Sequence, residues 1–114
     1  MKVSTSSYSY SGPHRYDITR KSGEVAFAPT WEMITQYKHD LLTEKEYKTL
    51  YYQQLKGNLR RFPLVWDTLL QRDEVVLICY CPADTFCHRH LLKEVIRRLC
   101  ERKGIPFEDG GEIA

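Results

Sequence analysis

The sequence lacks a large net charge, a long apolar run and an apolar block near its beginning. Lys and Arg total 17 against 15 Asp and Glu, which leaves a formal net charge of +2. So small an excess makes no strong case for a nucleic-acid binder. No stretch approaches the roughly 20 apolar residues that a membrane-spanning helix needs, and the polar start differs from a secretory signal. We therefore expect a cytoplasmic protein without membrane contact, whose residues 1–114 form one domain.

Cysteine is scarce as well, with four residues in the chain. Cys79 and Cys81 flank Tyr80 in an apolar run, Cys87 opens a helix-like segment, and Cys100 falls on the apolar side of that segment. Small disulfide-stabilised domains distribute their cysteines through loops instead. The placement therefore predicts free thiols in a reducing compartment, with Cys79 and Cys100 as small core residues.

The pattern of apolar residues predicts alternating strands and helices. We expect strands at 2–8, 15–19, 74–81 and 105–108, and helices that begin at Thr30 and Thr43, the second ending near Gly57-Asn58, with two more at 64–70 and 86–103. The residues of 74–81 are apolar on both alternating faces, which is typical of a parallel sheet covered by helices. The sequence therefore predicts an α/β fold, a single three-layer Rossmann-like domain with a small, mainly parallel sheet flanked by helices.

The segment from Cys79 to His90 carries three cysteines, two histidines and an arginine in twelve residues. It follows the central strand, where ligands collect at the carboxyl edge of a parallel sheet. We place the loop at 82–85 and Cys87 in the first turn of the next helix. Unpaired backbone N–H groups and the helix dipole there bind anions and lower the pKa of a thiol.

The helical angle separates the three residues that follow Cys87. At about 100° per residue, His88 falls in line with the apolar side and points toward the sheet. Arg89 lies at the edge of that side and reaches back over the strand ends, whereas His90 faces solvent. His88 is equally well explained as a core histidine bonded to a backbone carbonyl.

A metal site finds little support in the spacing of the possible ligands. Cys81, Cys87 and His88 or His90 offer three or four ligand atoms for zinc. No C-x2-C motif is present, and a C-x-C pair on one extended strand holds its thiols about 7 Å apart. We therefore predict no metal and no cofactor.

The same segment resembles the domain-of-unknown-function family DUF488, small bacterial and phage proteins. The family pattern is an apolar strand that ends in Cys-Tyr, a short loop, and Cys-His-Arg at the start of a helix; here it corresponds to 77–81 and 87–92. Upstream, 27–31, Tyr37-Lys38, 43–47 and Tyr51 are also similar, as is the ending at 110–113. The resemblance implies the α/β fold and a role for Cys-His-Arg, but no reaction. Family members often carry an arginine-containing segment after the first strand, for which Arg15 and Arg20 are the candidates.

The leading hypothesis is that the protein binds a small anionic, nucleotide-derived ligand at the carboxyl edge of the sheet. The predicted ligand-binding residues are Tyr8, Arg15, Arg20, Tyr80, Cys81, Cys87, His88 and Arg89. The alternatives are a cysteine-dependent enzyme and a protein-interaction module of phage or bacterial type. In the enzyme, Cys87 is the catalytic nucleophile and His88, His90 or a distant histidine such as His14 is the proton acceptor. We also expect a homodimer paired through the tyrosine-rich N-terminal edge.

Overall fold

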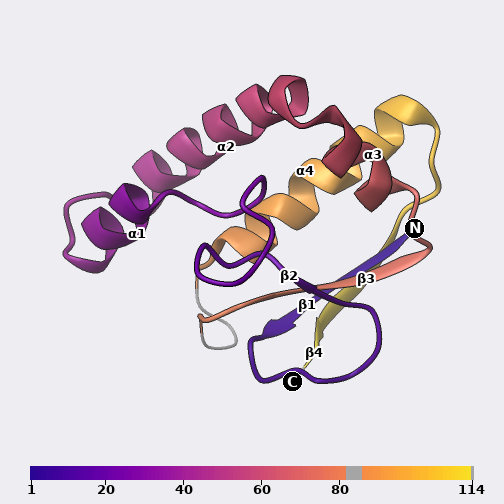
Figure 1. Cartoon of the computed structure of the whole chain (residues 1–114), viewed down its shortest axis with the longest axis horizontal. Helices are drawn as coiled ribbons and strands as arrows, with labels where there is room; N and C mark the ends of the chain where they lie inside the picture. Colours follow the sequence, from indigo (N-terminus) through magenta and orange to yellow (C-terminus); the bar gives the residue numbers. More distant parts are fainter. Residues whose placement is uncertain (82–85, 114) are drawn as a thin grey trace.

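The computed structural model describes residues 1–81 and 86–113, and the loop predicted at 82–85 lies outside them. The elements are β1 (Lys2–Ser7), β2 (Arg15–Asp17), α1 (Trp31–Lys38), α2 (Glu44–Arg61), α3 (Pro63–Leu70), β3 (Glu74–Cys79), α4 (His88–Lys103) and β4 (Glu108–Ile113). Figure 1 shows the helices beside one twisted sheet, with α4 running back from the end of β3 toward the start of β4. None of the described helices is long and apolar enough to cross a membrane.

The sheet has the strand order β2-β3-β1-β4, and every neighbouring pair is parallel. The α/β class, the Rossmann-like arrangement and the parallel sheet are therefore confirmed. β1 lies inside the sheet between β3 and β4. Its Ser4, Thr5 and Ser6 are buried. β2, the other N-terminal strand, forms one edge and β4 the other, and the homodimer stays a prediction.

β3 is the buried strand that the apolar run predicts, although it ends two residues earlier. Its residues from Val75 to Cys79 are at most 1% exposed. Val75, Leu77 and Cys79, on one face, join the main core with the apolar residues of the helices. The early end of β3 decides how the following cysteines are placed.

Local signals set the helix starts, and tertiary contacts move some ends. Thr43 and Glu46 form the predicted capping box at the start of α2. The helix does not stop at Gly57, because the Asn58 amide donates a buried 2.8 Å hydrogen bond to the carbonyl of Ala26 and so holds the last turn in place. Gly104 ends α4 as predicted, with a left-handed φ of 70°.

The last strand differs from the prediction at 105–108. Pro106 has no N–H to donate to a neighbouring strand, and pairing with β1 begins only at Glu108. Gly110 allows this pairing, since a Cβ at this position would lie 2.0 Å from the Ser4 hydroxyl oxygen. Gly110 and Gly111, which lie beyond the predicted strand, are therefore part of β4.

Candidate functional site

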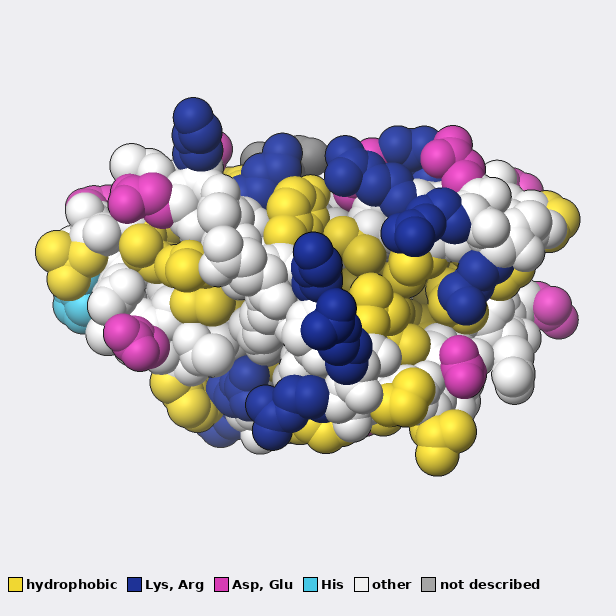
Figure 2. Space-filling model, turned by 90° about the horizontal axis from the view of Figure 1, so that it is seen from above, with side chains coloured by type: hydrophobic (Ala, Val, Ile, Leu, Met, Phe, Trp, Pro, Cys, Tyr) yellow, Lys and Arg dark blue, Asp and Glu magenta, His cyan; other side chains and the backbone are white. Residues whose placement is uncertain are grey.

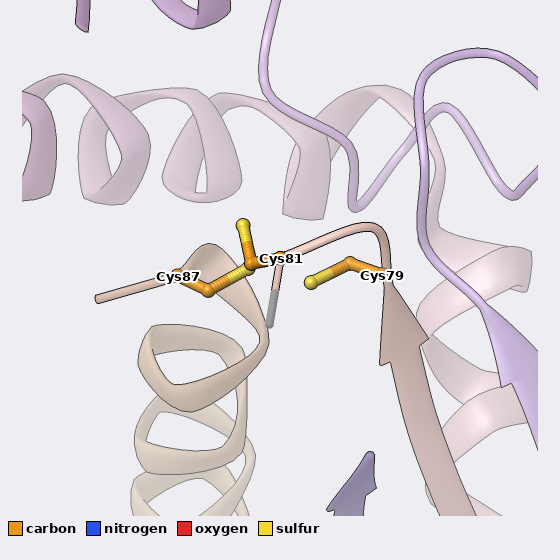
Figure 3. Close-up of side chains that lie close together, drawn as sticks. All are labelled: Cys79, Cys81 and Cys87. Carbon is orange, nitrogen blue, oxygen red and sulfur yellow. The ribbon is translucent and has the colours of Figure 1, made fainter. Parts of the chain in front are cut away.

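Three thiols meet where β3 ends and α4 begins. Cys79 is the last residue of β3, Cys81 follows two residues later, and Cys87 is the N-cap residue of α4. Figure 3 shows the Cys79 thiol directed toward the other two. The three sulfur atoms lie within 4.8 Å of one another. The predicted separation of about 7 Å is wrong because Cys81 has left the extended strand.

Arg89 lies against this thiol cluster of Cys79, Cys81 and Cys87, with its side chain fully buried. Its Nη1 donates hydrogen bonds of 3.0 Å to the Cys79 sulfur and to the Cys81 carbonyl oxygen. Its Nε and Nη2 each lie 3.0 Å from Glu112 Oε1 in β4. The side chain therefore reaches over the strand ends as predicted. Arg89 does not line the pocket over the thiol cluster, so it contacts the thiols from the side away from that pocket.

His88 is buried under the start of α4 and points toward the sheet side, as the helical angle predicts. Its Nε2 lies 2.8 Å from the carbonyl oxygen of Ile18, so this nitrogen carries the proton and donates. Burial lowers the pKa of the ring, which favours the neutral form. The unprotonated Nδ1 then faces the Cys87 sulfur at 3.5 Å. The Cys87 sulfur and the His88 ring nitrogen are therefore close to each other, although they belong to adjacent residues of the chain.

The pKa values of the three thiols are shifted in different directions. Hydrogen bonds donated by Cys81 and Cys87, together with Arg89, hold the pKa of Cys79 well below its ordinary value. The hydrogen bonds to Cys79 and Cys81 raise the pKa of Cys87, and the hydrogen bond to Cys79 raises the pKa of Cys81 to about 11. The expectation of a lowered Cys87 pKa is corrected, because Cys79 receives the hydrogen bonds that stabilise a thiolate.

A pocket of about 340 Å³ opens over the thiol cluster. The predicted residues Arg20, Tyr80, Cys81, Cys87 and His88 line it, together with others that include Ile34, Tyr37, Lys38, Tyr47 and Phe86. Sequence reasoning missed these last five as site residues. For Ile34, Tyr37 and Tyr47 the apolar sides of the first two predicted helices were the available signal, but periodicity does not show that these sides meet over the strand ends.

Tyr8, Arg15 and Tyr80 form a separate stack beside the pocket. The rings of Tyr8 and Tyr80 are stacked with centroids 4.3 Å apart, and the Arg15 guanidinium lies 4.8 Å from the Tyr8 ring centroid. Of these three residues, Tyr80 also lines the pocket. The structure therefore brings the predicted ligand-binding residues to one region. Some line the pocket, Tyr8 and Arg15 lie in the stack, and Arg89 contacts the thiol cluster.

The other two candidate histidines lie away from the Cys87 thiol. His90 is partly exposed and lies 3.8 Å from Glu112. His14 lies 4.0 Å from Glu74, the first residue of β3, whereas the thiols are at the other end of that strand. Of the histidines considered as proton acceptors, His88 is the one adjacent to the Cys87 sulfur.

The helical side of the molecule carries many basic side chains. Figure 2 shows Lys and Arg gathered there next to hydrophobic side chains. On α4, Arg97 is paired with Glu94 and Glu101, and Arg98 with Glu94, whereas Arg102 and Lys103 form no ion pair among the described residues. Such pairing reduces the local positive potential that attracts nucleic acid.

Comparison with known proteins assigns the family. No curated protein matches the chain, and no solved structure matches it. A family model, DUF488-N3a, described as the active DUF488-N3 subclade, matches residues 16–99. The match includes β3, the thiol cluster and most of α4. Because it covers well over half of the sequence, the chain belongs to the DUF488-N3a family.

Proposed function

We propose that the protein binds a small ligand with a flat apolar part and an anionic group, of the nucleotide-derived kind, in the pocket over the thiol cluster. The size of the pocket supports this, since about 340 Å³ falls within the range of small-molecule sites. Its position at the carboxyl edge of a parallel sheet is the usual one for ligands of α/β proteins.

The walls of the pocket favour a ring. Tyr37, Tyr47 and Phe86 pack against one another with centroid distances of 5.3 to 5.4 Å. Aromatic faces of this kind bind planar apolar groups by offset or edge-to-face contact. A nucleobase has the flat shape and polar edges that such a wall accepts.

Two cations at the pocket carry the proposal. The surface of the pocket is almost entirely apolar, with Arg20 and Lys38 among its lining residues, and neither forms an ion pair with a carboxylate of the described residues. The Arg20 guanidinium is held by the carbonyls of Pro29 and Ala28 at 2.9 and 2.8 Å, which orients it without neutralising its charge. A phosphate or carboxylate would supply the missing negative charge.

The test is a calorimetric titration with mono- and dinucleotides, using Lys38→Met and, as its matched control, Lys56→Met on the exposed side of α2. We expect Lys38→Met to weaken the best ligand about tenfold and Lys56→Met to leave it unchanged. Arg20→Met should act in the same direction as Lys38→Met. Absence of binding by every nucleotide, or equal affinity in Lys38→Met and Lys56→Met, would refute the proposal.

The contact between Cys87 and His88 favours a second candidate, a cysteine-dependent enzyme in a reducing cytoplasm. Transfer of the thiol proton to Nδ1 at 3.5 Å would leave a thiolate that forms a bond to an electrophilic carbon of the bound ligand, while the bond from that carbon to its leaving group breaks and the leaving group takes the proton from His88. If His88 takes the Cys87 proton in spite of the raised pKa of this thiol, brief treatment with iodoacetamide, followed by peptide mass analysis, should modify Cys87 before Cys100. Equal and slow modification of both would exclude this enzyme.

A further inference from the structure

We propose that Cys79, Cys81 and Cys87 bind one zinc ion at the base of the pocket, with the fourth coordination position open to the ligand. The proposal is independent of the nucleotide hypothesis, because it rests on the thiol cluster and not on the cations at the pocket. It differs from the expectation of no metal, which rested on a separation of about 7 Å that the early end of β3 removes.

The positions of the sulfur atoms are close to those of a metal site. Three thiolates around a tetrahedral zinc, each about 2.3 Å from the ion, lie about 3.8 Å apart. The thiols here are already within 4.8 Å of one another. Cys81 is half-buried and outside any strand, so rotation of its side chain would bring its sulfur closer to the other two. β3 and α4 meanwhile fix Cys79 and Cys87.

The surroundings of the cluster suit thiolate ligands. Zinc with three thiolates carries a net charge of −1, and the Arg89 guanidinium brings a positive charge to 3.0 Å from the Cys79 sulfur. N–H groups donated to ligating sulfur orient it and stabilise its charge. Glu112 shares this guanidinium, but its side chain is 19% exposed, so water offsets part of its charge.

The fourth position distinguishes this site from a closed structural one. Structural zinc sites use four protein ligands, whereas catalytic sites use three and leave one position for water or substrate. All three cysteines line the pocket, so the ion would face the space that the ligand enters. His88 Nδ1, which lies 3.5 Å from the Cys87 sulfur, would be next to a water bound there.

Cobalt substitution tests the proposal on the reduced protein. Co²⁺ should give the near-ultraviolet absorption of thiolate-to-metal charge transfer and the intense visible bands of tetrahedral coordination, and one equivalent of Zn²⁺ should abolish both. Competition with a chromogenic chelator then gives the Zn²⁺ affinity. In the folded protein, Zn²⁺ should also slow the alkylation of Cys79, Cys81 and Cys87 and leave the rate at Cys100 unchanged.

Cys81→Ser is the informative variant, and Cys100→Ser is its matched control. Cys81 is only half-buried, so its replacement leaves the core intact, whereas Cys100 lies outside the cluster. We expect Cys81→Ser to weaken Zn²⁺ at least about 100-fold and Cys100→Ser to bind like the wild type. Absence of the thiolate absorption, or equal affinity in the two variants, would overturn the proposal. Nucleotide titration with a chelator present tests the ligand hypothesis separately.

Discussion

Replacing Arg89 by lysine should destabilise the fold, and the structure allows the size of the effect to be worked out. The guanidinium binds Glu112 through Nε and Nη2, and it donates from Nη1 to Cys79 and Cys81. A lysine ammonium keeps the charge but cannot reach all of these groups from one nitrogen. Loss of one partner of a buried ion pair costs about 3–5 kcal/mol. Because lysine keeps the positive charge, the cost is smaller, and we expect Arg89→Lys to lower the free energy of unfolding by about 2–3 kcal/mol.

The assay is urea unfolding and thermal unfolding followed by circular dichroism, with reductant and chelator present. A loss of this size should lower the Tm by about 10 °C in a domain of this length. Arg98→Lys is the control, because Arg98 is 61% exposed and lies 3.4 Å from Glu94 on the same helix. It should change stability by less than about 0.5 kcal/mol. If the two variants lose the same stability, the supporting role assigned to Arg89 is refuted.

Three further predictions concern stability alone. Thr43→Ala should cost about 1 kcal/mol in urea unfolding, because it removes the N-cap of α2; no change would argue against the capping box. Tyr51→Phe should cost about 1–2 kcal/mol, measured in the same way, because the buried Phe27 carbonyl loses a 2.6 Å hydrogen bond; an unchanged midpoint would contradict this. Burial raises the pKa of Tyr16 from 10.0 to about 12, so its contribution is complete below pH 10.0 and is lost as the pH rises toward about 12. Urea midpoints at several alkaline pH values should fall across this window, and a flat profile would refute the argument.

The elements that the sequence predicts well carry their own local signals. β3 has an uninterrupted apolar run, the start of α2 has a capping box, and Gly104 ends α4. The direction of His88 follows from helix geometry alone. Such signals depend on residues within a few positions of each other, so they do not depend on tertiary contacts with distant segments.

The parts that the sequence does not predict depend on contacts between distant segments. The thiol cluster forms because β3 stops at Cys79, and nothing in the apolar run marks that end. Arg89 is identified as a site residue from the sequence, but its partner Glu112 lies 23 positions away in a strand that was predicted elsewhere. That strand was predicted at 105–108, but the pairing with β1 begins only at Glu108, and the close approach of Gly110 to Ser4 becomes visible only once β1 is in place.

The interior position of β1 has a consequence for how the chain folds during synthesis. β1 is made first, yet its partners β3 and β4 come much later, and Thr5 contacts Glu112 across 107 positions. A fold dominated by such distant pairings acquires its order late and slowly. Until β4 leaves the ribosome, one edge of β1 stays unpaired and exposed to aggregation. Stalled chains that end before Glu108 should therefore be targets for chaperones or proteases, since they lack both the last strand and the carboxylate that holds Arg89.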